Sequence, residues 1–214
     1  MTNPARIRGR AAALQIENLD TDQIMPKQFL RGIDKSGLNE GLFYDLRFDT
    51  EGRPRPDFVL NQAAYAGISV LVGGSNFGCG SSREHAVWGL LQFGIRAVVA
   101  PSFAEIFFSN AMNNRLLLVT LPPDEIAKLI LDTKNPAGNV VDIDVASQTL
   151  RSQSVHTGFD LAGRHRRMFL EGLDNIGLSL KYRDQINVFA AGHWQTQPWL
   201  KDVAARVRAR LFST

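Results

Sequence analysis

The middle of the chain carries the clearest pattern of apolar and polar positions. Residues 68–72 read Ile-Ser-Val-Leu-Val, which predicts a buried strand, and a glycine-rich loop follows over residues 73–81. From Ser82 onward, apolar residues recur at the i, i+3, i+4 spacing of one helical face, and Gly94 stands where the helix should end. The pattern therefore predicts a strand, a loop and a helix in that order.

Similar segments lie on both sides of this unit. An opening strand is predicted over residues 8–16, and residues 32–57, rich in Gly, Asp, Arg and Pro, are predicted to be mostly loop with a short helix. Further strands are predicted over residues 96–100 and 116–120, helices over residues 104–113, 123–132, 160–172 and 175–182, and a hairpin over residues 140–145 and 149–151. The alternation of strands and helices favours an α/β fold with a parallel core, to which the hairpin adds antiparallel strands.

Chain length bounds the domain organisation. A chain of 214 residues can bury one substantial core and carry a short appendage, but it is too short for two full domains. We find no internal repeat and no linker between domains. We expect one domain over residues 1–185 and a C-terminal extension over residues 186–214, helical by prediction, which packs loosely or contacts a partner.

Composition and charge exclude several classes of protein. Hydrophobic residues make up 44% and charged residues 21%, which indicates a soluble globular protein. The longest uncharged stretch, residues 61–82, is broken by glycines and does not predict a membrane span. No signal peptide is recognisable, so we expect a cytoplasmic protein. The net charge of +3 is spread over helix-like faces without an RNA-binding aromatic motif, so we expect no nucleic-acid partner.

Cys79 is the only cysteine, which excludes an internal disulfide. It also excludes a self-contained iron–sulfur cluster or thiolate zinc site, because these need several cysteine or histidine ligands. The four histidines show no spacing typical of metal ligands. We therefore expect this chain to bind no metal, and any cluster that its chemistry requires must lie in another polypeptide.

The glycine loop is where we place the chemistry, because ligands of open α/β sheets bind outside the carboxyl ends of the strands. A helix beginning at Ser81 or Ser82 would direct unpaired N–H groups and its positive dipole end towards an anion. A P-loop is excluded because Gly80 is followed by Ser-Ser-Arg, and a dinucleotide-binding loop is excluded because Arg83 replaces the required glycine or alanine. The G-x-S-x-G elbow of serine hydrolases is also absent.

Residues of this loop also have structural interpretations. Ser81 and Glu84 match the S-x-x-E capping box, so both could simply cap the helix. Capping does not explain Arg83, because a cation in the first helical turn opposes the helix dipole. A role in binding an anionic substrate through two hydrogen bonds would explain it. Cys79 could be a nucleophile near His85, or a small residue packed in a tight loop.

Residues 76–86, Asn-Phe-Gly-Cys-Gly-Ser-Ser-Arg-Glu-His-Ala, resemble the signature of the aconitase superfamily's swivelling domain, in the form seen in bacterial 3-isopropylmalate dehydratase small subunits. Residues 18–26, 100–104 and 172–178 resemble three further motifs of that family, in the same order and spacing. The resemblance extends from about residue 8 to residue 181. It implies a three-layer β/β/α fold whose mainly parallel central sheet carries added antiparallel strands.

The resemblance also implies a reaction and a partner. The family's enzyme interconverts 2-isopropylmalate and 3-isopropylmalate through 2-isopropylmaleate in leucine biosynthesis, and one subunit alone would be inactive. A [4Fe–4S] cluster would lie in a large subunit, joined to this chain in a heterodimer or a larger assembly. Such a reaction needs a Lewis acid for the hydroxyl group and fixed cations for the carboxylates, which a serine and an arginine alone do not supply.

The resemblance assigns roles to individual residues. Ser81 would be the base that takes and returns the carbon-bound proton, and Ser82 and Arg83 would bind a substrate carboxylate. Asp22, with Thr21, would line the same cleft and orient these groups. The alternative for Asp22 is an Asx-type turn.

Three residues that follow this acidic segment are candidates for substrate recognition. Arg31 falls where aconitase has a substrate-binding arginine, although dehydratase small subunits vary there; the alternative is an exposed loop arginine. Phe29 and Leu30 fall in the region that sorts substrate side chains, where an apolar pair would suit an isopropyl group. Core packing is the alternative for both.

Two rival functions remain open from the sequence. One is a small subunit of a related hydro-lyase, of the homoaconitase, citraconate or methylmalate, or dimethylmalate type. The other is a non-catalytic protein whose glycine loop holds an anion without turnover.

Overall fold

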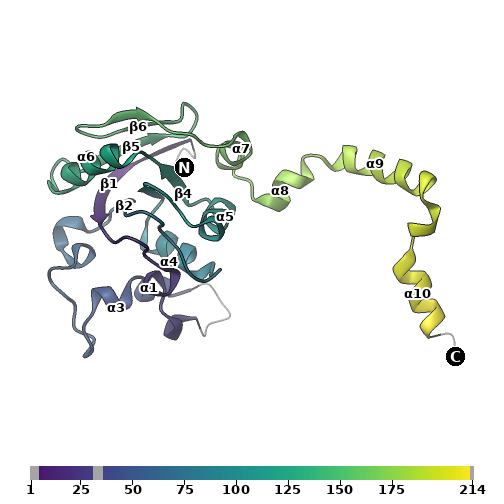
Figure 1. Cartoon of the computed structure of the whole chain (residues 1–214), viewed down its shortest axis with the longest axis horizontal. Coiled ribbons are helices and arrows are strands. Elements are labelled where there is room, and N and C mark those ends of the chain that lie inside the picture. Colours follow the sequence, from purple (N-terminus) through teal and green to yellow (C-terminus); the bar gives the residue numbers. More distant parts are fainter. Residues whose placement is uncertain (1–4, 31–35, 213–214) are drawn as a thin grey trace. The chain divides into compact units, whose positions relative to one another are not determined.

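The computed structural model describes residues 5–30 and 36–212. The chain forms two compact units, Met1–Asp174 and Asn175–Thr214, which are considered separately (Figure 1). The predicted division at residue 185 stays a prediction. No helix among the described residues is both long and apolar enough to cross a lipid bilayer.

Unit 1 is built on a seven-stranded sheet with the order β4-β3-β2-β1-β5-β6-β7. Its strands are β1 (Arg6–Leu14), β2 (Val70–Gly73), β3 (Ala97–Ala100), β4 (Leu117–Thr120), β5 (Val140–Asp144), β6 (Thr149–Arg151) and β7 (His156–Gly158). β1 to β4 run parallel, whereas β5 to β7 pair antiparallel on the other side of β1. The α/β fold with a parallel core, and the hairpin between β5 and β6, are therefore as predicted.

The helices of unit 1 are α1 (Thr21–Ile24), α2 (Leu38–Gly41), α3 (Tyr44–Arg47), α4 (His85–Phe93), α5 (Glu105–Asn113), α6 (Pro123–Thr133) and α7 (Gly163–Glu171). Short 3₁₀ turns occupy Lys27–Phe29, Val59–Asn61 and Ala63–Tyr65. α6 packs on β1 and β2, α5 packs on β4, and α1 and α2 pack against α4 (Figure 1). All residues of β2 and β3 are buried, which explains their uninterrupted apolar sequence.

The start of α4 was predicted wrongly. The helix begins at His85 with Glu84 as its N-cap, and no side chain caps it. The capping box of Ser81 and Glu84 does not form, and the Glu84 carboxylate accepts a hydrogen bond from Asn114, the C-cap of α5, instead. Arg83 consequently lies before the helix and not in its first turn. The predicted end is correct, since Gly94 caps α4 with a φ of 109°.

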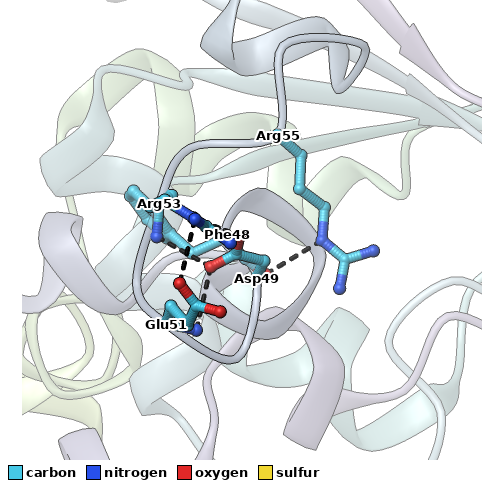
Figure 2. Close-up of polar contacts among 5 residues, drawn as sticks. All are labelled: Phe48, Asp49, Glu51, Arg53 and Arg55. Atoms are coloured by element: carbon cyan, nitrogen blue, oxygen red, sulfur yellow. Dashed lines mark hydrogen bonds and ion pairs between the residues drawn. The ribbon is translucent and has the colours of Figure 1, made fainter.

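The loop after α3 is held by its own polar groups (Figure 2). Asp49 accepts hydrogen bonds from the backbone N–H groups of Glu51 and Arg53, both at 2.9 Å, and Arg53 Nε lies 2.9 Å from its second oxygen. Arg55 Nε donates to the Phe48 carbonyl at 2.9 Å. The hydrogen bonds to Asp49 lower the pKa of its carboxyl, and the bond from the Arg53 backbone lowers it most. The charges of this loop therefore stabilise a turn.

Unit 2 consists of α8 (Asn175–Leu180), α9 (Arg183–Thr196), a 3₁₀ turn (Pro198–Leu200) and α10 (Val203–Leu211). Neither α9 nor α10 contains a buried residue. Large apolar side chains are exposed along both helices, among them Phe189 and Val207. Unit 2 thus has helices but little core of its own.

Candidate functional site

Two loops join at the carboxyl ends of β1 and β2. The segment after β1 and the glycine loop after β2 are linked by backbone hydrogen bonds, from Gly78 N–H to the Leu19 carbonyl at 2.7 Å and from Thr21 N–H to the Cys79 carbonyl at 2.9 Å. Asp20 and Cys79 form an isolated parallel bridge between them. Because β1 and β2 are neighbouring parallel strands, their following loops emerge side by side. This topology places the two predicted motifs in one site.

Two glycines of the loop adopt a backbone conformation that disfavours side chains. Gly78 has a φ of 79° and Gly80 a φ of 91°. A Cβ atom on Gly78 would lie 2.2 Å from Cγ of Phe107 in α5. The loop therefore passes so close to α5 that only glycine fits at position 78.

The Ser81 backbone is fixed by α1. Asp20 caps this helix in a capping box with Gln23, and the Gln23 N–H donates to the Asp20 carboxylate at 2.7 Å. This positions Thr21, which is only 1% exposed, to donate from Oγ1 to the Ser81 carbonyl at 3.0 Å. The Ser81 residue is exposed, and its hydroxyl has no hydrogen-bond partner among the described residues. A fixed backbone thus presents an available hydroxyl.

Arg83 and Asp22 form an ion pair across the two loops. Their side chains are 24% and 39% exposed, so both remain accessible to a bound molecule. Lys27 Nζ lies 3.7 Å from the second oxygen of Asp22. Two cations therefore share one carboxylate where the two loops meet. The ion pair also explains Arg83 structurally, which the sequence pattern did not.

Two asparagines, Asn110 of α5 and its C-cap Asn114, also contact the glycine loop. Asn110 Nδ2 donates to the Ser82 carbonyl at 3.2 Å, and Asn114 Nδ2 donates to the Glu84 carboxylate. Trp88 Nε1 donates in turn to Asn114 Oδ1 at 3.0 Å. The sequence interpretation missed both asparagines. Their i, i+4 spacing was the available signal, since Asn110 lies in the helix predicted over residues 104–113 and Asn114 directly follows it, which places two amides on one face.

Cys79 is partly buried, and its Sγ lies 3.1 Å from the Asn18 carbonyl. This contact agrees with a small residue packed in the loop. Among residues 5–30 and 36–212, no group of three His, Cys, Asp or Glu side chains is placed to hold a metal ion. The donor set of this chain therefore does not fit a metal or cluster site within the described residues.

The candidate residues for substrate recognition are only partly placed. The Phe29 ring lies 5.0 Å from the Tyr44 ring, and a Cβ atom on Gly41 would lie 2.5 Å from Cγ of Phe29. Phe29 and Leu30 are both half-buried against the hydrophobic core. Arg31 lies outside the described residues. The structure thus brings together Thr21, Asp22, Ser81 and Arg83, and places Ser82 beside them as an exposed residue held through its carbonyl.

Three comparisons with known proteins point to the same family. Residues 1–124 match the aconitase C-terminal domain. The chain is 61% identical to a 3-isopropylmalate dehydratase small subunit of Chromobacterium violaceum, over 99% of this chain and all of that protein. It is 47% identical to the corresponding small subunit of Caulobacter vibrioides, over 92% of this chain and 97% of that protein. A solved 3-isopropylmalate dehydratase structure from Methanocaldococcus jannaschii is similar with a TM-score of 0.61 and 30% identity, over 86% of this chain and 99% of that one.

Proposed function

The chain belongs to the family of 3-isopropylmalate dehydratase small subunits, and from this premise we propose that it completes the active site of a two-subunit hydro-lyase. The reaction is the interconversion of 2-isopropylmalate and 3-isopropylmalate through 2-isopropylmaleate, a step of leucine biosynthesis. We expect the enzyme to act in the cytoplasm. The observation that carries the proposal is the meeting of Ser81, Arg83 and Asp22 at the junction of two loops.

Ser81 is the residue to which we assign proton transfer. Dehydration removes a weakly acidic proton from the carbon beside a carboxylate, so the base must lie where positive charge lowers the cost of an ionised hydroxyl. Arg83 and Lys27 supply that charge within the same site. Ser81, ionised to an alkoxide, takes the carbon-bound proton during dehydration while the substrate's hydroxyl group leaves as hydroxide. It returns the proton when hydroxide adds back during hydration, and the hydrogen bond from Thr21 to the Ser81 carbonyl holds the residue in place.

Substrate binding falls to the residues that follow Ser81. Arg83 can offer the guanidinium N–H groups not used by Asp22 to a substrate carboxylate, and the Ser82 hydroxyl can donate to the same anion. Thr21 and Asp22 orient these two groups. Arg31 is proposed as a further contact, and Phe29 with Leu30 as the apolar surface for the isopropyl group.

The active site is proposed to be shared with a partner. Because the donor set of this chain does not fit a cluster, we place the [4Fe–4S] cluster of the reaction in a large subunit. In the proposed assembly, a heterodimer or larger, the loop carrying Ser81 closes one side of the substrate site. The chain alone is then inactive.

Co-expression tests this proposal. The chain is purified alone and together with the large-subunit protein encoded in the same genome, and hydration of 2-isopropylmaleate is measured for both. We expect activity only in the complex. Activity of the isolated chain, or a complex that prefers citraconate, dimethylmaleate or homoaconitate, would overturn the assignment of subunit or substrate. A stable complex that turns over none of them would favour the non-catalytic anion-binding protein.

Ser81→Ala tests the proposed base. We expect turnover to fall by at least about 10²-fold, the lower range for positioned acid–base groups, with subunit assembly and iron content unchanged. Ser109→Ala, at an exposed serine of α5, is the matched control and should keep full activity. Loss of folding in Ser81→Ala would instead indicate that the hydroxyl is structural.

A further inference from the structure

A second concave site lies at the amino ends of the parallel strands, the edge opposite to the glycine loop. This edge pocket has a volume of about 640 Å³, within the usual range for small-molecule sites. Four arginines line it, Arg6 and Arg8 in β1, Arg96 just before β3 and Arg115 just before β4. No aspartate or glutamate is among its lining residues.

The acidic groups near the edge pocket compensate only part of this charge. Arg6 forms an ion pair with Asp142 of β5 and is also influenced by Asp144. Arg8 faces the same Asp142 at longer range. Arg96 and Arg115 are exposed and have no ion pair or side-chain hydrogen bond within the described part of the chain. An excess of positive charge therefore surrounds the cavity.

Helix ends at the same edge do not account for all four arginines. α4 and α5 end there, and each helix C-terminus carries roughly half a negative charge, which favours nearby cations. Together the two helix ends offset about one positive charge, Asp142 offsets another, and Asp144 adds to the compensation at Arg6. Arg96 and Arg115 therefore remain without an acidic partner among the described residues, and their charge is available to an anion.

Arg115 has a left-handed backbone conformation. The residue follows Asn114, the C-cap of α5, and has a φ of 61°, in the left-handed region that favours glycine after a helix. Gly94 after α4 and Gly172 after α7 occupy such positions, with φ values of 109° and 67°. At this position Arg115 lines the edge pocket.

The edge pocket also has an apolar part. Ile7, Leu91 and Phe169 contribute to its lining beside the arginines. A cavity with several cations and apolar side chains is complementary to a molecule that combines an anionic group with a hydrocarbon body. Inorganic anions would use only the arginines.

We propose that the edge pocket is a binding site for a small organic anion, a carboxylate or phosphate attached to an apolar group, distinct from the glycine-loop site. Arg96 and Arg115 bind the anionic group, and Phe169 with Leu91 contacts the apolar body. The proposal does not depend on the proposed reaction, because none of these residues belongs to the catalytic loop.

The test uses the full-length chain and two probes, 4-phenylbutyrate and phenyl phosphate, which separate carboxylate from phosphate ligands. Two control ligands are measured as well: inorganic phosphate, which lacks the apolar body, and benzyl alcohol, which lacks the charge. Binding is followed by calorimetry and by backbone NMR shifts. We expect one site for at least one of the two organic anions, weaker or absent binding of the other probes, and shifts at Gly94 and Arg115 but not at Gly80.

Variants decide which residues carry the binding. Arg96→Gln combined with Arg115→Gln should weaken it at least about tenfold, the effect of losing roughly 1.4 kcal/mol. Arg183→Gln, which removes the same charge from unit 2, and Arg83→Gln in the glycine loop should not change it. No binding, or equal binding by the double variant, overturns the proposal. Loss of the shifts when the large subunit is added also overturns it and assigns the arginines to a subunit contact.

Discussion

Gly78 has no space for a side chain, and its backbone conformation disfavours one as well. Gly78→Ala would place a methyl group 2.2 Å from the Phe107 ring at a φ of 79°. Gly37 provides a matched control, because its φ is 72° and no atom of the described residues lies within 4 Å of the position that a methyl group would take there. We expect Gly37→Ala to cost about 1 kcal/mol from backbone strain and Gly78→Ala at least about 1–3 kcal/mol more from overpacking. Urea unfolding measures both, and equal losses would contradict the close contact.

Substitution of Arg83 tests whether its ion pair with Asp22 is mainly structural. Because both side chains are partly exposed, the pair should contribute no more than about 1 kcal/mol to stability. Arg83→Lys keeps the charge but loses the bidentate geometry, so kcat/KM of the assembled enzyme should fall at least about tenfold, the loss of one charge-assisted hydrogen bond. Arg55→Lys, outside the site, is the control. A large drop in melting temperature with unchanged kcat/KM would point to a structural role.

The residues of the site were predictable from the sequence only where they belong to a continuous motif. Ser81 and Arg83 lie in one such motif and Asp22 in another, and the structure brings both together. Asn110 and Asn114 were not predictable, because their contacts with the loop depend on how α5 packs. The structural reason for Arg83 was equally hidden, since its partner is 61 residues away in the sequence.

At the scale of the elements, local patterns located β1 to β6 but missed β7, and they misplaced one helix start. β2 and β3 are short apolar segments buried on both sides, so their composition alone identifies them. The start of α4 was misplaced because Ser81 and Glu84 match a local capping pattern. A tertiary hydrogen bond from Asn114 engages the Glu84 carboxylate instead, and the helix begins at His85.

Asp132 shows how an unfavourable local position is stabilised by a neighbouring element. It lies near the C-terminus of α6, where a negative charge opposes the helix dipole. Burial alone would raise its pKa, but hydrogen bonds from Ser152 Oγ at 2.6 Å and Ser154 N–H at 2.9 Å outweigh burial and lower the pKa below its usual value near 3.8. The carboxylate thereby joins α6 to the segment between β6 and β7.

Asp132→Ala should therefore destabilise unit 1 by about 1–3 kcal/mol at neutral pH, because two part-buried hydrogen bonds to the carboxylate are lost. A carboxyl whose pKa is lower in the folded state stabilises the fold above its unfolded pKa, and this contribution is lost as the pH falls through the folded pKa. The difference between wild type and variant should thus shrink below about pH 4. Asp124→Ala, at the exposed first turn of α6, should cost less than about 1 kcal/mol. A pH-independent difference would contradict the lowered pKa.

At the scale of the whole molecule, the order of elements made the parallel core predictable, but it did not reveal the edge pocket. Arg6, Arg8, Arg96 and Arg115 lie in or before three different strands, and only the parallel alignment of β1, β3 and β4 brings them to one edge. In the sequence they are separate basic residues with no common motif. Sites built from strand ends of this kind need the sheet order before they can be recognised.

The two units should differ strongly in local stability. α9 and α10 contain no buried residue, and isolated helices of fewer than about 12–15 residues are marginally stable in water. Backbone amides of α10 and much of α9 should therefore exchange with solvent several orders of magnitude faster than those of β2 and β3, whose residues are all buried. Hydrogen exchange with mass spectrometry measures this in the isolated chain at two concentrations. Strong protection at both concentrations would mean that unit 2 is stable by itself; protection only at the higher one would mean that the exposed apolar side chains pair between copies.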